Sequence, residues 1–197
     1  MTAVARRGPP REVRIIGGQW KRSKLPVADT PGLRPSPDRV RETLFNWLGQ
    51  DLDGWRCLDA FAGSGALGFE AASRGASKVV LVERDRGLVR SLNESRERLS
   101  AGAVKVESAD ALAFMRRADP ASFEIVFVDP PFDANLFESA LTVAAPLVVP
   151  GGFVYLEADR TFDDAAVGPL GLSVHRHARA GGVHFHLLQR RPNADEA

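Results

Sequence analysis

The chain has 197 residues, of which 44% are hydrophobic and 26% are charged, a composition that can bury a substantial core. No apolar run approaches the ~20 residues of a membrane-spanning helix. No apolar stretch follows Arg6 and Arg7, so we expect neither a membrane segment nor a secretory signal. Cys57 is the only cysteine, which excludes an intrachain disulfide and argues against a cysteine-built metal site. We therefore expect a cytoplasmic protein.

Charge is distributed unevenly along the chain. Residues 1–45 carry a net charge of +6, whereas the formal net charge of the whole chain is +1. A basic segment on a mildly acidic body is typical of a protein with a polyanionic partner, although a solvated leader would have the same composition. The candidate phosphate-binding residues of this segment are Arg14, Lys21, Arg22, Lys24, Arg34 and Arg39.

The N-terminal part is expected to begin with a disordered basic leader over residues 1–12. An extension over residues 13–50 follows. Within it, the apolar run 13–16 and a second short run that ends at Val27 lie on either side of Gly17-Gly18. This pattern predicts a β-hairpin.

The extension is expected to end in a helix. Val40, Leu44 and Phe45 recur at helical spacing, which predicts an amphipathic helix over residues 38–50. Ser36 is the expected N-cap, because its hydroxyl could accept from a free backbone N–H of the first turn.

From Trp55 onward, apolar strands alternate with helices. The strands are expected at 56–61, 78–83, 103–107, 124–128, 152–157, 172–176 and 183–189, and the helices at 65–74, 86–99, 109–117 and 136–149. Continuous apolar strands separated by helices predict an α/β fold with a mostly parallel seven-stranded sheet and helices on both faces. The last two strands should add an antiparallel edge. We assign residues 51–191 to this domain and 192–197 to a disordered tail.

A glycine-rich segment follows the first strand of the predicted sheet. Its sequence, DAFAGSGALG at 59–68, contains the pattern G-x-G-x-x-G at Gly63, Gly65 and Gly68. Glycines at such a turn let the backbone bend sharply and approach a ligand closely. By itself the pattern also fits a nicotinamide-dependent dehydrogenase or a tight turn without a ligand.

Three acidic residues at predicted strand ends narrow the choice of ligand. Asp59 precedes the glycines, where a carboxylate would repel a diphosphate but attract a cationic ammonium group. Glu83 ends the next strand, 24 residues later, and suits hydrogen bonds to ribose hydroxyls. Asp110 follows the third strand, where it could reach an adenine edge or act as a helix N-cap.

A second motif, Asp129-Pro130-Pro131-Phe132, directly follows the strand predicted at 124–128. Two prolines stop the strand and stiffen the turn, and they keep their carbonyl acceptors although they lack N–H donors. A carboxylate, a carbonyl and an aromatic face then project from one rigid turn. This combination suits a planar base with an amino group, because two acceptors can bind the N–H groups while the phenylalanine stacks on the ring.

The two motifs, at 59–68 and 129–132, together resemble the class I amino-methyltransferases. The segments 15–21 (IIGGQWK), 33–35 (LRP) and 38–48 (DRVRETLFNWL) are similar to the bacterial 16S rRNA guanine-N2 methyltransferase family. The resemblance implies a Rossmann-like fold, S-adenosyl-L-methionine as cofactor, and methylation of the exocyclic N2 amino group of guanine 966 in 16S rRNA. It also implies that the substrate is the assembled or assembling small ribosomal subunit.

Site residues follow from the motifs and from this resemblance. The predicted catalytic residues are Asp129, Pro130, Pro131 and Phe132, and the predicted cofactor-binding residues are Asp59, Phe61, Ala62, Gly63, Ser64, Gly65, Gly68, Glu83, Arg84, Asp110 and Ala111.

Several alternatives remain open. A DNA adenine or a protein glutamine could be the methyl acceptor, although the basic segment argues against a protein. A nicotinamide-dependent dehydrogenase and a non-catalytic RNA-binding domain are less consistent with Asp59, Glu83 and Asp129. Nothing in the sequence marks an association surface, so we expect a monomer. We expect no metal and a structural or surface role for the alternating histidines, which are His175, His177, His184 and His186.

Overall fold

The computed structural model describes residues 11–27, 36–132 and 135–192. Its strands are β1 (Arg11–Arg14), β2 (Lys24–Val27), β3 (Arg56–Asp59), β4 (Lys78–Glu83), β5 (Val104–Ser108), β6 (Phe123–Val128), β7 (Val148–Ala158), β8 (Leu172–Ala180) and β9 (Val183–Arg190). Its α-helices are α1 (Asp38–Trp47), α2 (Ala66–Ser73), α3 (Arg86–Arg98), α4 (Ala111–Met115), α5 (Phe137–Ala144) and α6 (Asp164–Val167), and short 3₁₀ turns follow α5 and α6.

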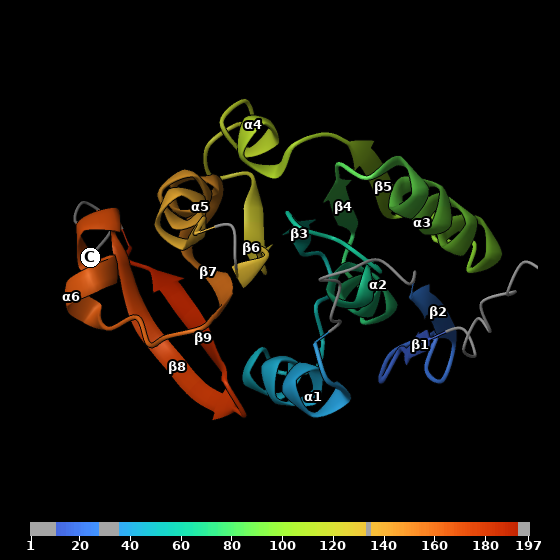
Figure 1. The fold of residues 1–197 in the computed structure, drawn as a ribbon, viewed down its shortest axis with the longest axis horizontal. Coiled ribbons are helices and arrows are strands. Elements are labelled where there is room, and N and C mark those ends of the chain that lie inside the picture. The colour runs from blue at the N-terminus through green and yellow to red at the C-terminus, as the bar shows by residue number, and fades with distance from the viewer. Residues whose placement is uncertain (1–10, 28–35, 133–134, 193–197) are drawn as a thin grey trace, which may run out of the picture.

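Seven strands form one sheet in the order β5-β4-β3-β6-β7-β9-β8 (Figure 1). The pairs among β3 to β7 are parallel, and β9 pairs antiparallel with both β7 and β8. The predicted fold, a mostly parallel seven-stranded sheet with an antiparallel edge, is therefore confirmed. The strand order reverses between β3 and β6, and ligands of such sheets bind at this switch point, beyond the carboxyl ends of the strands.

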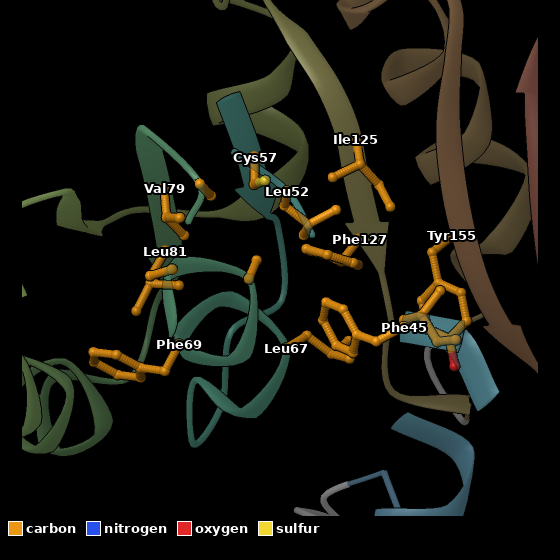
Figure 2. Packing of buried hydrophobic residues seen from close by; sticks show 14 of the residues in the cluster. Phe45, Leu52, Cys57, Leu67, Phe69, Val79, Leu81, Ile125, Phe127 and Tyr155 are labelled. Atoms are coloured by element: carbon orange, nitrogen blue, oxygen red, sulfur yellow. The ribbon is translucent and has the colours of Figure 1, made fainter. Parts of the chain in front are cut away.

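Alternating side chains of the strands divide the core into two layers. On one face, Cys57, Leu81 and Phe127 pack with residues of α1, α2 and α3. Figure 2 shows labelled side chains of this layer, which come from α1, α2, the neighbouring strands and, for Leu52, the segment between α1 and β3. On the other face, Leu58 and Val126 pack with residues of α4, α5 and α6. Helices thus cover both faces of the sheet, as the sequence pattern predicts.

Helix α1 belongs to the core of the sheet domain. Its residues Leu44 and Phe45 are fully buried, and the Phe45 ring lies 6.3 Å from that of Phe127 on β6. The predicted N-cap is wrong, because Pro37 occupies the N-cap position. The Ser36 hydroxyl instead donates a hydrogen bond to the buried carboxylate of Glu157 on β7, which needs a donor more than the exposed helix end does.

Some predicted element boundaries shift in the structure. Helix α5 ends at Ala144 rather than near residue 149, because Pro146 lacks the N–H that an α-helix requires and the chain tightens into a 3₁₀ turn. Strand β7 accordingly starts at Val148, four residues earlier than predicted. The final hairpin is also longer than predicted, with β8 reaching Ala180.

Candidate active site

The predicted site acids lie together at the carboxyl edge of the sheet. Asp59 of β3 pairs with Leu81 of β4 on one side and with Phe127 of β6 on the other. Glu83 and Asp129 each follow the partner of Asp59 by two residues. Parallel pairing therefore places all three carboxylates at the edge where the strand order reverses.

The glycine-rich loop joins β3 to α2 in a conformation that requires glycine at two positions. Gly63 and Gly65 have φ values of 53° and 77°, in the left-handed region that residues with a side chain rarely adopt. Gly68 lies at the first turn of α2, where an added Cβ would come within 2.1 Å of Leu81. The third glycine therefore permits the close packing of helix on strand.

Glu83 holds this loop from the end of β4. One carboxylate oxygen accepts a hydrogen bond from the backbone N–H of Gly63 at 3.0 Å, and the other accepts from Asp85 at 2.8 Å. A carboxylate has about four lone-pair sites, so two remain for the hydroxyl groups of a ligand. Glu83 is half-buried and thus accessible beside the loop.

Asp59 is 2% exposed, and its Oδ2 atom accepts a hydrogen bond from the backbone N–H of Gly68 at 2.9 Å. Burial raises the pKa of Asp59 to about 7, a shift that the Gly68 hydrogen bond partly opposes and the charges of Glu83 and Glu157 reinforce. No cation among residues 11–27, 36–132 and 135–192 pairs with Asp59, and a buried carboxylate in this position favours a positively charged group nearby.

The remaining predicted cofactor residues lie around these two acids. Asp110 is the N-cap of α4, with its carboxylate accepting from the backbone N–H of Ala113 at 2.9 Å. This capping role leaves other lone pairs of the exposed carboxylate available. Ala62, Ser64 and Ala111 are buried, Phe61 is half-buried and Arg84 is exposed.

The second motif forms the turn that leaves β6. Asp129 is half-buried, Pro130 is buried and Pro131 is exposed. Burial raises the pKa of Asp129 well above its ordinary value, and the negative charges of Glu157 and Asp59 raise it further.

Phe132 presents its ring at the surface of this turn. Among residues 11–27, 36–132 and 135–192 it is the exposed large hydrophobic side chain, at 37% exposure. Its ring lies edge-on to Phe137 of α5, at 5.7 Å between centroids. An aromatic ring that is fixed from one side and open on the other can stack on a planar ligand.

Sequence reasoning missed three residues beside Asp129. Glu157 follows Leu156, the residue of β7 that pairs with Val128, so it lies across from Asp129. It is 4% exposed, and its Oε1 atom accepts hydrogen bonds from the Ser36 hydroxyl and, at 2.8 Å, from the Tyr155 hydroxyl. The available signal was an acid at the end of an otherwise apolar strand.

The N-terminal hairpin is anchored to α2 (Figure 1). The fully buried carboxylate of Glu70 accepts hydrogen bonds from the backbone N–H groups of Ile16 at 2.7 Å and Gly17 at 2.8 Å. It also forms ion pairs with Arg74 at 2.8 Å and with the buried Arg41 at 3.4 Å. Arg41 therefore contributes to packing although it belongs to the basic segment.

The anchored hairpin presents most of the predicted phosphate-binding residues. Arg14, Lys21, Arg22 and Lys24 are exposed on its strands and connecting turn, and Arg39 is exposed in the first turn of α1. Lys24 also pairs with Glu12 at 2.7 Å. Arg34, like most of the basic leader and the tail, lies outside the described residues.

The histidines form a local cluster at the β8–β9 edge. His177 Nε2 and His184 Nδ1 are 3.1 Å apart, and His186 accepts a hydrogen bond from the backbone N–H of Phe162 at 3.0 Å. Across the part of the chain that the structure describes, no group of three or more His, Cys, Asp or Glu side chains could hold a metal ion.

No helix within that part is long and apolar enough to cross a membrane. Cys57 is fully buried, and burial raises its pKa, which suits packing rather than reactivity.

Comparison with known proteins links this geometry to a family. Residues 13–189 match the model of a family described as Conserved hypothetical protein 95. The chain is 43% identical over 182 residues to ribosomal RNA small subunit methyltransferase D of Escherichia coli K12, covering 91% of this chain and 90% of that protein. It is 38% identical over 183 residues to the protein of the same name from Haemophilus influenzae, covering 90% of this chain and 94% of that protein.

Solved structures agree with these sequence matches. An Escherichia coli structure described as the methyltransferase yhhF has a TM-score of 0.80 and 41% identity, covering 93% of this chain and all of that one. A Thermus thermophilus protein, TTHA0928, has a TM-score of 0.71 and 32% identity, covering 89% of this chain and 98% of that one.

Proposed function

This chain belongs to the family that includes ribosomal RNA small subunit methyltransferase D, and we propose that it methylates the exocyclic N2 amino group of guanine 966 in 16S rRNA. The methyl donor is S-adenosylmethionine. The observation that carries the proposal is the convergence of two motifs at one sheet edge. The Gly63–Gly68 loop with Asp59 and Glu83 lies on one side of the switch point, and Asp129 with the exposed Phe132 lies on the other.

The residues of the first motif fit S-adenosylmethionine. Its amino-acid part carries an ammonium group, which suits the buried carboxylate of Asp59. Its ribose carries two hydroxyls, which suit the unused lone pairs of Glu83. The backbone at Gly63 and Gly65 approaches closely because no side chain stands in the way. When bound, the cofactor supplies an electrophilic methyl group on sulfur.

The residues of the second motif fit an extruded guanine. Phe132 stacks on the base and returns ~1–3 kcal/mol of the few kcal/mol that extrusion costs. Asp129 accepts a hydrogen bond from the amino group, which is a poor nucleophile because its lone pair is delocalised into the ring. A carbonyl of Pro130 or Pro131 accepts the second N–H. Together they orient the nitrogen lone pair toward the methyl group, so that positioning and electrostatics supply much of the acceleration. As the N–C bond forms, the S–C bond of the donor would break to leave a neutral thioether, and the nitrogen would release one proton to the Asp129 carboxylate.

The hairpin and the start of α1 bind the surrounding RNA. Lys21, Arg22 and Arg39 are exposed on elements that Glu70 and the core hold in place, so their charges are oriented relative to the site. Phosphate contacts of this kind position a nucleic acid without reading its sequence. We propose that the substrate is the assembled or assembling small subunit, that the enzyme acts as a monomer, and that it works in the cytoplasm.

The proposal is tested by mapping modified nucleosides of 16S rRNA by mass spectrometry in cells with and without the gene. The expected result is the loss of one N2-methylguanine at position 966 and its return when purified protein and S-adenosylmethionine are added to the deficient subunits. An unchanged modification map, or loss of a methyl group from adenine or from a protein glutamine, would contradict it.

A further inference from the structure

A second carboxylate, Glu157 on β7, lies beside the turn that begins at Asp129 and belongs to neither motif. Asp129 and Glu157 directly follow the paired residues Val128 and Leu156 on the parallel strands β6 and β7. Their side chains therefore leave the sheet at the same level. Glu157 is 4% exposed, so its charge is shielded from water rather than solvated.

Hydroxyl groups, rather than a cation, hold this second carboxylate. Ser36 and Tyr155 both donate to its Oε1 atom, and the Ser36 hydroxyl also lies close enough to Asp129 to lower the pKa of that carboxyl group. Arg41, whose charge lowers the pKa of Glu157, is fully buried but directs its guanidinium nitrogens to Asp38, Glu70, the Ser36 carbonyl and the Arg14 carbonyl. The Ser36 hydroxyl thus lies near two acids that form no ion pair with any residue that the structure describes.

We propose that Glu157 is a positioning residue for Asp129, that the two carboxyl groups hold one proton between them, and that the Ser36 hydroxyl donates its single hydrogen to whichever of the two is ionised. The pair then presents a single negative charge to the acceptor amino group. This inference rests on the proposed function of Asp129 as the acceptor of that group. Two adjacent carboxylates, one buried and one half-buried, cannot both remain ionised without a cost in free energy.

The charged groups around Asp129 agree with this arrangement. Glu157 and Tyr155 face it from β7, Asp59 from β3, and Arg41 stands behind Ser36 on α1. Burial raises the pKa of both carboxyl groups, and the negative charges of Glu157 and Asp59 raise that of Asp129 further. The Ser36 hydroxyl lowers the pKa of each group, and the Tyr155 hydroxyl also lowers that of Glu157. Arg41 lowers that of Glu157. Removing Glu157 or Ser36 should therefore move the titration of Asp129 in opposite directions.

The experiment is a carbon-13 NMR titration of Asp129 in the full-length protein without ligand, in two variants. Glu157→Gln keeps the shape and the hydroxyl contacts but removes a negative neighbour, so the Asp129 midpoint should move to lower pH. Ser36→Ala removes a donor to the carboxylate, so the midpoint should move to higher pH. The control is Glu107→Gln on β5, the far edge of the sheet, which should leave the midpoint unchanged.

An unchanged Asp129 midpoint in Glu157→Gln, or shifts of the same sign in both variants, would overturn the inference. If circular dichroism shows that Glu157→Gln does not fold, the test rests on Ser36→Ala. An unchanged Asp129 midpoint in Ser36→Ala would then overturn the inference. The titration needs no substrate, so it is independent of whether guanine N2 is the acceptor. The rate of single-turnover methylation, measured as a function of pH, should then begin to rise at a lower pH in Glu157→Gln than in the parent protein. If the rate rises at the same pH in both proteins, Glu157 has no positioning role.

Discussion

The buried carboxylate of Asp59 accepts a hydrogen bond from the backbone N–H of Gly68 at 2.9 Å, which ties the end of β3 to the first turn of α2. The same carboxylate is proposed to bind the ammonium group of S-adenosylmethionine. One side chain thus shapes the loop and contacts the ligand, and its raised pKa couples ligand binding to pH.

Cofactor affinity should therefore rise with pH up to about pH 7 and then level off. The free protein has an Asp59 pKa of about 7, raised mainly by burial. A bound ammonium group favours the ionised carboxylate, so binding below that pH must release a proton, at a cost of up to about tenfold in affinity per pH unit. Calorimetry in buffers of different ionisation enthalpy should detect this proton. Constant affinity between about pH 5.5 and 7, or proton uptake, would exclude the ammonium contact.

Replacing Glu83 should weaken cofactor binding. Glu83→Ala removes a charged acceptor of the ribose hydroxyls and the contacts to Gly63 and Asp85, and hydrogen bonds to charged groups are worth ~1.5–3 kcal/mol. The expected loss is about ten- to a hundredfold in affinity, measured by titration calorimetry. Glu83→Gln, which retains one acceptor oxygen, should lose less. Parent-like affinity in Glu83→Ala would remove Glu83 from the site.

Neutralising two exposed cations of the hairpin should weaken RNA binding and flatten its salt dependence. The double variant Lys21→Gln, Arg22→Gln removes two phosphate contacts, so the slope of log affinity against log salt should fall by ~1.5–2. The matched control neutralises Lys78 and Lys105, which lie near the starts of β4 and β5, away from the carboxyl edge. Equal slopes in the two double variants would show that the hairpin does not face the RNA.

Removing the ring of Phe132 should weaken engagement of the target base. Phe132→Ala should cost ~1–3 kcal/mol in RNA binding, which is the stacking contribution of one base on an aromatic side chain. Folding should change little, because the ring is already 37% exposed. Phe132→Tyr keeps the stacking face and is the matched control. Equal RNA affinity of the alanine and tyrosine variants, measured on subunits lacking the modification, would show that the ring does not stack.

Much of the fold and of the site can be predicted from local patterns of apolar and acidic residues in the sequence. Apolar strands separated by helices predict a parallel sheet, and the carboxyl ends of parallel strands must meet, which brings Asp59, Glu83 and Asp129 together. The role of Glu157 depends on which strand lies beside β6, and chain order does not specify that neighbour. Ser36 was misjudged for a related reason: its hydroxyl serves a buried carboxylate 121 residues away instead of the adjacent helix end.

The contacts that attach the N-terminal hairpin to α2 could not be predicted either, because they join residues that are far apart in the sequence. Glu70 reads as an ordinary helix residue, yet it is fully buried and receives two backbone N–H groups and two arginines. The net charge of +6 over residues 1–45 predicts a basic surface. It does not indicate that Arg41 turns inward, since that depends on a partner from α2 that only the folded chain supplies.

Asp59 and Glu83 are proposed to bind the cofactor, whereas Asp129 is proposed to act on the acceptor base. Asp129→Ala should abolish methyl transfer while leaving cofactor affinity within about threefold, because an acceptor that matters most in the transition state lowers turnover more than binding. The decisive measurement is single-turnover methylation of small subunits that lack the modification, with S-adenosylmethionine binding to the same variant measured in parallel. The account predicts lost transfer with retained cofactor binding. Transfer at the parent rate, or failure to bind S-adenosylmethionine, would contradict it.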